Sequence, residues 1–310
     1  MTTLAVWPSY LALLESGELE LRAQAARRRM ESCDLCARRC RVNRLGDARG
    51  AACRTGALAV VHGHGPHYGE ERPLTGRLGS GTIFFSWCSL RCVFCQNWTI
   101  SQRGDGVETS SAALARMMLD LQRLGCHNLN LVTPSHVVAQ VLEALVLAAR
   151  RGLRLPIVWN TGGYDSREAL DLLDGIVDIY MPDIKYADDA AALAYSRAPG
   201  YWAACTEAVR EMHRQVGDLV VDEDGLARRG LLVRHLVLPG GSSGTRRVLE
   251  FLAEEISPDT YLNLMDQYRP AYRAWQHPPL DRSTTTAEYD HAVLLAAEAG
   301  LHRLDAPRRR

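Results

Sequence analysis

An α/β fold is predicted by two features of this 310-residue sequence, in the form of a partial (β/α)6 TIM-like barrel that follows a Cys-rich metal-binding segment. From residue 81 onward, six short apolar runs alternate with amphipathic stretches, and this alternation is typical of parallel β/α units. Polar or charged residues follow several of the runs directly. Because the active sites of β/α barrels lie at the carboxyl ends of the strands, these positions are the first candidates for functional residues.

The pattern assigns six strands and five helices. We expect strands at residues 82–87, 128–133, 156–160, 177–185, 232–239 and 260–265. We expect helices at residues 110–124, 135–150, 166–173, 201–215 and 244–255, several of which begin at a potential N-cap. Residues 1–30 predict a helical lead-in, whereas residues 31–80 lack periodicity and are expected to form loops. The predicted domains are therefore 1–80, the lead-in and Cys-rich metal-binding segment, and 81–310, the barrel.

Composition and charge are those of an ordinary globular protein, with 47% hydrophobic residues and a net charge of zero. The zero net charge argues against nucleic acid or an anionic membrane as a partner. The apolar run at residues 137–149 is too short to span a bilayer, and no signal peptide is expected. We expect a cytoplasmic protein whose nine cysteines serve metal or redox chemistry. The short basic tail at residues 306–310, "APRRR", is expected to be a frayed end.

Three closely spaced cysteines are the strongest chemical signal in the sequence. Cys88, Cys92 and Cys95 directly follow the first predicted strand with the spacing C-x3-C-x2-C. Thiolates are the usual ligands of iron–sulfur clusters, which this spacing favours. A zinc site that takes its fourth ligand from elsewhere stays open as an alternative, as do buried thiols without any metal.

The same segment resembles the signature of the radical S-adenosylmethionine (SAM) superfamily, because an aromatic residue, Phe94, precedes the last cysteine of a triad that follows a first strand. The extension "CSLRCVFCQN" followed by Ser101 is similar to PflX-type iron–sulfur proteins, a branch related to pyruvate formate-lyase activating enzyme. The similarity extends from "CDLCARRC" to "YLNLMDQYRPAY". It implies that Cys88, Cys92 and Cys95 hold a 4Fe–4S cluster with one iron open for SAM. Reductive cleavage of SAM would then give a 5′-deoxyadenosyl radical that abstracts hydrogen.

The resemblance also implies a SAM site at the strand ends. Relatives usually carry a Gly-Gly-Glu segment after the second strand, but this sequence has residues 133–136, "TPSH", with no carboxylate. The candidate SAM-binding residues are Thr133, Ser135, His136, Asn160, Thr161, Asp183, Lys185, Arg234 and His235. A helix cap stays an alternative for Ser135. For the last two residues the alternative is a core position for His235 and an outward-facing side chain for Arg234. Gln267, after the last strand, is expected to close the substrate pocket.

Asp183 and Lys185 are the candidate catalytic residues. They interrupt an apolar strand pattern, and residues at positions i and i+2 share one face of a strand. Buried charges are costly unless they are paired, so the two side chains are expected to converge. Lys185 is the single lysine among 36 basic residues. Because a compact ammonium group is not interchangeable with a planar guanidinium group, this lysine is predicted to have a specific role. Activating enzymes carry a similar Asp-x-Lys.

Four further cysteines precede the barrel with the spacing C-x2-C-x3-C-x12-C. These residues, Cys33, Cys36, Cys40 and Cys53, can close a tetrahedral metal site. The spacing leaves zinc, a rubredoxin-like iron site and a second iron–sulfur cluster open, with a slight preference for the first two. Histidines at positions 62, 64 and 67 could contribute but are more simply explained as loop residues. Cys126 and Cys205 are expected to be small core residues.

The leading functional hypothesis is a radical SAM enzyme that receives electrons from a flavodoxin-type or ferredoxin-type donor. Its substrate is a protein glycine if the likeness to activating enzymes extends to function. The alternative substrate is a small molecule or a peptide, because the extra cysteines precede the triad here rather than follow it. A zinc-stapled binding protein without catalysis is the remaining alternative, although it leaves the polar residues at the strand ends unexplained.

Overall fold

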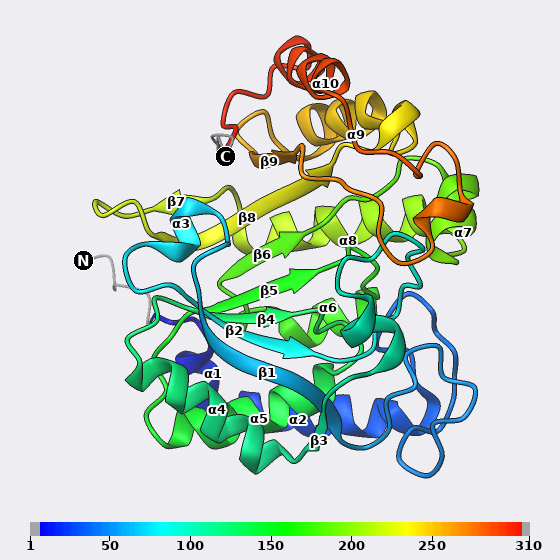
Figure 1. Cartoon of the computed structure of the whole chain (residues 1–310). Coiled ribbons are helices and arrows are strands. Elements are labelled where there is room, and N and C mark those ends of the chain that lie inside the picture. Colours follow the sequence, from blue (N-terminus) through cyan, green and yellow to red (C-terminus); the bar gives the residue numbers. More distant parts are fainter. Residues whose placement is uncertain (1–6, 306–310) are drawn as a thin grey trace.

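The computed structural model describes residues 7–305 of the chain (Figure 1). The basic tail predicted at residues 306–310 therefore lies outside the described residues. A nine-stranded sheet runs through the centre of the molecule, and helices cover it along its outer side. Within residues 7–305, no helix is both long enough and apolar enough to cross a membrane.

Six parallel strands form the barrel part of the sheet and confirm the predicted α/β fold. They are hydrogen-bonded to one another in the order in which they occur in the chain. Each overlaps one of the predicted apolar runs: β2 (Ser80–Phe85), β4 (Leu129–Val132), β5 (Ile157–Thr161), β6 (Ile179–Pro182), β8 (Ala227–Leu236) and β9 (Tyr261–Met265). Strand β8 begins before the run predicted at residues 232–239. Because all six strands run the same way, their carboxyl ends meet at one edge of the sheet.

Helices connect these strands where they are predicted. They are α4 (Ser111–Arg123), α5 (Val138–Arg150), α6 (Arg167–Leu173), α8 (Tyr201–Val216) and α9 (Thr245–Phe251), which a π-helical turn (Leu252–Ile256) extends. Two more helices, α7 (Asp189–Ser196) and α10 (Thr286–Glu298), were missed because their apolar residues do not follow a clear helical period. A capping box between Thr285 and Glu288 begins α10, and this signal is visible in the sequence.

The predicted lead-in forms two helices that pack on the core of the barrel. They are α1 (Tyr10–Ser16) and α2 (Glu18–Arg29), and Gly17 separates them with a φ of 79° that glycine adopts without steric cost. Tyr10, Leu19 and Met30 are completely buried in the same hydrophobic cluster as Leu142 of α5. Figure 1 shows α1 and α2 beside α4 and α5 on one flank of the sheet.

Residues 59–67 correct one prediction, because they form a strand rather than a loop. This strand, β1 (Ala59–His67), lies between β2 and β3 (Val107–Thr109) and pairs antiparallel with both. Glycine and proline have low strand propensity, so pairing with β2 rather than intrinsic preference fixes this conformation. A short helix, α3 (Arg72–Thr75), follows it, and a short strand, β7 (Val220–Val221), pairs with β8. The predicted domain boundary at residue 80 thus falls between paired strands, and the division itself stays a prediction.

Asp178, which stands out in the sequence as a charge in an apolar run, is a structural carboxylate. Its fully buried side chain accepts hydrogen bonds from the amide (2.9 Å) and hydroxyl (2.8 Å) of Ser9 and from the amide of Ile157 (2.9 Å). We expect Asp178→Ala to lower the free energy of unfolding by about 3 kcal/mol, because buried donors lose their acceptor. Urea denaturation checks this value.

The matched control for this prediction is Asp174→Asn, which removes an exposed carboxylate that pairs with Arg214. Exposed ion pairs contribute little, so this variant should lose less than about 1 kcal/mol. If the Asp178→Ala variant lost no more than the control, the lead-in would not depend on this carboxylate.

Candidate active site at the carboxyl ends of the strands

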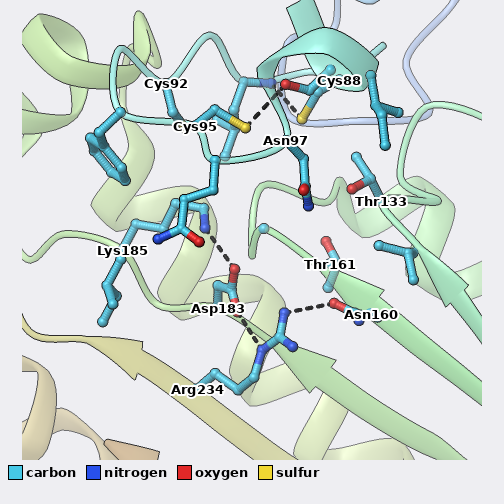
Figure 2. A pocket seen from close by; sticks show the side chains of 18 of the residues that line it. Cys88, Cys92, Cys95, Asn97, Thr133, Asn160, Thr161, Asp183, Lys185 and Arg234 are labelled. Carbon is cyan, nitrogen blue, oxygen red and sulfur yellow. Dashed lines mark hydrogen bonds and ion pairs between the residues drawn. The ribbon is translucent and has the colours of Figure 1, made fainter. Parts of the chain in front are cut away.

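A cavity of ≈ 260 Å³ lies at the carboxyl ends of the six parallel strands (Figure 2). Every one of these strands, or the residues that directly follow it, contributes to the cavity wall. Six of the nine predicted SAM-binding residues line it: Thr133, Asn160, Thr161, Asp183, Lys185 and Arg234. The structure therefore gathers most of the candidates where a β/α barrel carries its active site.

Cys88, Cys92 and Cys95, called the cysteine triad below, also line this cavity (Figure 2). The hydroxyl of Ser196 donates a hydrogen bond to Sγ of Cys92 (2.9 Å), and Oγ of Ser101 lies 3.1 Å from Sγ of Cys95. Burial raises the pKa of Cys88 to about 12, and burial also raises the pKa of Cys92. These two thiols therefore stay protonated at neutral pH unless a bound metal displaces the protons.

A chain of charged and polar side chains crosses the cavity opposite the triad (Figure 2). The carboxylate of Asp183 accepts hydrogen bonds from Nζ of Lys185 and from Nε of Arg234, each at 2.6 Å. Nη2 of Arg234 donates to Oδ1 of Asn160 at 2.8 Å. This group of four residues, called the polar chain below, ties together the ends of β5, β6 and β8. The convergence predicted for Asp183 and Lys185 is thus present.

Burial and ion pairing oppose each other in the polar chain. Burial favours a raised pKa for Asp183, but Arg234 and Lys185 outweigh it and lower this pKa to about 2. Burial favours a lowered pKa for Lys185, but the carboxylate of Asp183 outweighs it and raises this pKa to about 12. Both groups are therefore charged at neutral pH. Their side chains are 20% (Lys185) and 19% (Asp183) exposed, which leaves them accessible from the cavity.

Thr133, which lines the cavity, and Trp87, which directly precedes the cysteine triad, have strained backbones. Trp87 and Thr133 have φ angles of 66° and 61°, in a region that bulky and β-branched residues rarely adopt. The amide of Thr133 donates to the carbonyl oxygen of Asn160 (2.8 Å), and the amide of Trp87 donates to that of Ile100 (3.0 Å). Strain of this kind persists where surrounding contacts impose it, commonly at functional sites. Trp87 directly precedes Cys88, so its conformation sets the direction in which the triad loop leaves β2.

Ser135 and His136 are not among the residues that line the cavity, although the sequence made them candidates. Both are buried behind its wall. Oγ of Ser135 lies 2.8 Å from Oγ1 of Thr161, and Nε2 of His136 lies 2.9 Å from the carbonyl oxygen of Ser86. Burial lowers the pKa of His136 to about 3, so its imidazole is neutral. The geometry makes these residues supports of the cavity wall.

His235 is also absent from the cavity lining, whereas its neighbour Arg234 is present. Successive strand residues point to opposite faces, so one of the two had to face away from the lumen. The His235 imidazole is fully buried between the carbonyl oxygen of Ile184 (2.7 Å) and Oγ1 of Thr245 (3.0 Å). Burial lowers its pKa to about 4. His235 is therefore a core residue, which was one of the possibilities left open by the sequence. Arg234 is the residue of the two that faces the lumen.

Comparison with known families decides what kind of domain this cavity belongs to. Residues 82–223 match the model of the Radical SAM superfamily. The chain carries a radical SAM domain. Members of this superfamily are enzymes, so the protein is a radical SAM enzyme, and the alternative of a non-catalytic binding protein is set aside. A radical SAM domain implies a 4Fe–4S cluster, SAM and a source of electrons.

The individual relatives do not identify a substrate for this protein. An uncharacterized protein of Methanocaldococcus jannaschii is 29% identical over 292 residues, which cover 91% of this chain and 79% of that protein. The crystal structure of methylornithine synthase (PylB) has a TM-score of 0.47 at 16% identity and covers 94% of this chain and 72% of that one. A structure of TYW1 with a lysine–pyruvate adduct bound has a TM-score of 0.43 at 11% identity, with 70% and 73% covered.

The donor set of the radical SAM domain fits the cluster that such a domain implies. The cysteine triad provides three thiols to one cavity, and thiolates are the ligands that iron–sulfur clusters use. The polar chain provides an ammonium, a guanidinium and an amide within the same cavity. As the side chains stand, no three His, Cys, Asp or Glu residues between positions 7 and 305 are grouped so that they could hold a single metal ion.

Some lining residues of the radical SAM domain were not predicted. Gln96 and Asn97 follow the triad directly and line the cavity, into which Asn97 points in Figure 2. Because they directly follow Cys95 in the sequence, they could have been predicted as cavity residues. Gln267, which is expected from the sequence to close the substrate pocket, also lines the cavity. Asn263, on the same strand face as Met265, instead donates a hydrogen bond from Nδ2 to Oε1 of Glu71 (2.8 Å).

The four upstream cysteines lie outside the cavity of the radical SAM domain. Cys33, Cys36 and Cys53 are buried, and Cys40 is half-buried. Burial raises the pKa of the Cys36 thiol, and the nearby Cys53 and Cys33 add to this rise. These three thiols are thus electrostatic neighbours. The role of the group as a second metal site is taken up below.

Proposed function

We propose that the protein is an activating-enzyme-like radical SAM enzyme of the PflX-type branch. In this proposal, Cys88, Cys92 and Cys95 hold a 4Fe–4S cluster, SAM occupies the cavity, and hydrogen is abstracted from a protein glycine. The observation that carries the proposal is the cavity itself, which has three thiols on one side and the polar chain on the other. When bound, the cluster and SAM supply a 5′-deoxyadenosyl radical that abstracts the hydrogen atom.

The polar chain has the chemistry to orient SAM in this cavity. Lys185 presents an ammonium group that suits a carboxylate, while the carboxylate of Asp183 suits an ammonium group. Thr133 and Thr161 add hydroxyl groups to the wall. SAM carries both an amino and a carboxylate group, so the polar chain can bind both groups without a further charged residue. We assign Asp183 and Lys185 to this contact.

The apolar part of the wall has a separate task, which is to keep water away from a reactive radical. Phe84 and Phe94 line the cavity from strand β2 and from the triad loop. Met265 and Tyr268 line it from the last strand and the segment that follows. The ring of Phe94 packs edge-on against Tyr268 at 5.7 Å between centroids. This contact closes the cavity between the triad loop and the carboxyl-terminal segment, on the side that we assign to substrate.

A small molecule or peptide remains the second candidate substrate. The observation in its favour is residues 133–136, which lack the carboxylate usual in relatives of activating enzymes. The two candidates are separated by mixing the reduced enzyme and SAM with a glycyl-radical enzyme and recording its EPR spectrum. A protein-based glycyl radical supports the first candidate. 5′-Deoxyadenosine without any protein radical supports the second.

Lys185→Arg tests the polar chain with the charge conserved. We expect turnover of SAM to fall at least about tenfold, because a planar guanidinium cannot replace a compact ammonium at the same contact. The free energy of unfolding should change by less than about 1 kcal/mol, because the ion pair with Asp183 keeps its charges. The measurement is 5′-deoxyadenosine formed per minute, beside a urea denaturation curve. Unchanged turnover would contradict the prediction that Lys185, the single lysine, has a specific role.

A further inference from the structure

The four upstream cysteines lie in a compact turn between α2 and β1. The amide of Cys33 donates to the carbonyl oxygen of Val42 (3.1 Å), and the amide of Arg41 donates to that of Cys33 (2.9 Å). These two bonds bring Arg41 and Val42 beside Cys33, so the chain folds back on itself directly after Cys40. The segment from residue 33 to residue 53 carries four thiols, and those of Cys33 and Cys53 act electrostatically on the thiol of Cys36. Within residues 7–305 the thiols as they stand are not grouped around one metal position, so binding a metal requires their side chains to turn toward one another.

The backbone around these cysteines is strained. Arg39 and Arg41 flank Cys40 with φ angles of 40° and 56°, and Arg54 follows Cys53 with a φ of 53°. Three residues other than glycine in the left-handed region within such a short segment are unusual. Conformations of this kind persist when surrounding interactions impose them, as in ligand clamps. Metal–sulfur bonds at Cys40 and Cys53 are interactions of the required strength.

Arg44 adds a buried positive charge to the same region. The residue is 2% exposed, and its guanidinium donates to the carbonyl oxygens of Thr55 (2.6 Å) and His136 (2.8 Å). A third contact joins Nη1 of Arg44 to Sγ of Cys33 at 3.4 Å. Carbonyl oxygens accept hydrogen bonds but carry no net charge, so these contacts leave the positive charge of the arginine without a balancing anion.

A carboxylate is not what balances Arg44. In the part of the chain that the structure describes, Arg44 forms no ion pair with an Asp or Glu side chain. The carboxylate next to Cys33 belongs to Asp34, and it pairs with Arg29 (2.7 Å) and Arg41 (2.8 Å). A buried charge is costly unless an opposite charge accompanies it. The groups left to supply negative charge beside Arg44 are the cysteine sulfurs.

We propose that Cys33, Cys36, Cys40 and Cys53 are the four thiolate ligands of a second metal centre, and that Arg44 balances part of its negative charge. Four thiols each release one proton on binding a divalent ion, which leaves the centre with a net charge of −2. A 4Fe–4S cluster with four thiolates is also anionic. Zinc and iron–sulfur ligation thus share the chemistry that Arg44 requires, and the experiment below separates them.

The position of residues 33–53 indicates how a metal bound there affects the cysteine triad. Nε of Arg38 donates to the carbonyl oxygen of Ser89 (2.8 Å), and Nη2 of Arg91 donates to that of Ala52. Ser89 and Arg91 belong to the triad loop, whereas Arg38 and Ala52 belong to the upstream segment. Fixing the upstream segment with a metal therefore also fixes the loop that carries Cys88 and Cys92.

The test uses the full-length chain with all three cysteines of the triad replaced by alanine, so that the first cluster cannot contribute. Purified anaerobically and reconstituted with iron and sulfide, this variant should retain about one zinc, about one iron without sulfide, or about four irons with sulfide per chain. Metal and sulfide analysis separates these three forms, and each of them supports the proposal. A triple variant that folds but holds no stoichiometric metal would overturn it.

A second set of variants keeps the test open if the metal-free protein unfolds. In the same triple variant, Cys36→Ser should abolish stoichiometric metal, whereas Cys126→Ala, at a buried cysteine outside both groups, should leave it unchanged. Retention of the metal by the Cys36→Ser variant would contradict the ligand assignment. Because the wild-type protein can still be assayed for SAM cleavage, failure here leaves the proposed function untouched, and the reverse also holds.

Arg44→Met tests the charge balance itself. Removing a supporting group beside metal ligands typically lowers metal affinity 10–100-fold, and we expect a decrease of about that size in competition with a chelator. Arg44→Lys keeps the charge and should recover part of the affinity. Arg27→Met is the matched control, since Arg27 donates to the carbonyl oxygen of Ala57 near the segment rather than to a thiol. Equal affinities for the Arg44→Met and Arg27→Met variants would exclude a role for Arg44.

Discussion

Cys92→Ala is expected to reduce 5′-deoxyadenosine formation to the background of SAM without protein. The triad has three thiols, and a cluster that loses one of them has two irons without a protein ligand. Cys92 is the strictest test, because the residue is only 8% exposed and its thiol receives a hydrogen bond from Ser196 at 2.9 Å. A cluster that depends on this thiol has little room to recruit another ligand.

The measurement combines 5′-deoxyadenosine analysis with a urea denaturation curve, because loss of activity through unfolding has to be excluded. The matched control is Cys205→Ala, which also shortens a buried cysteine, in α8 and outside both cysteine groups. It should keep SAM cleavage. If the Cys92→Ala variant cleaved SAM at the wild-type rate, the assignment of the cluster to the triad would be wrong.

Asp183→Asn is expected to lower the free energy of unfolding by about 3 kcal/mol and to stop turnover. Asp183 is the shared partner of Lys185 and Arg234. An asparagine of the same shape keeps hydrogen-bonding capacity but leaves two mostly buried cations without their common anion, and breaking a buried pair in this way is strongly destabilising. Urea denaturation and 5′-deoxyadenosine analysis measure the two effects.

A double variant separates stability from catalysis at this position. Asp183→Asn combined with Lys185→Met removes one of the two unpaired cations, so it should regain part of the lost unfolding free energy. It should not regain turnover, because both proposed SAM contacts are absent. Recovery of turnover together with stability would show that Asp183 acts through folding alone.

Much of the fold was predictable because the six parallel strands carry simple signals. Each contains a short apolar run, and each overlaps the strand expected there, although β8 begins earlier than expected. Strand β1 could not be predicted in the same way, since its Gly, Pro and His residues adopt a strand through pairing with β2. Pairing of this kind joins segments that a local sequence pattern treats separately.

The candidate site shows the same division between local and long-range information. The pairing of Asp183 with Lys185 follows from the two-residue period of a strand, and the structure contains it. The choice between Arg234 and His235 depends on which face of β8 meets the lumen, and neighbouring strands fix that face. The hydrogen bond from Arg234 to Asn160 joins β8 to β5 across β6. No local sequence pattern indicates a contact between residues so far apart in the chain.

The central claim is that the triad supplies three ligands and leaves one iron of the cluster open for SAM. The most direct test is the EPR spectrum of the anaerobically reconstituted and reduced protein, recorded with and without SAM. The second centre is removed from the comparison by using its metal-free variant, where that variant folds, or by subtracting the spectrum of the triad variant. We predict that SAM changes the spectrum of the triad cluster and that 5′-deoxyadenosine forms. A spectrum that SAM leaves unchanged, with no 5′-deoxyadenosine, would contradict the account.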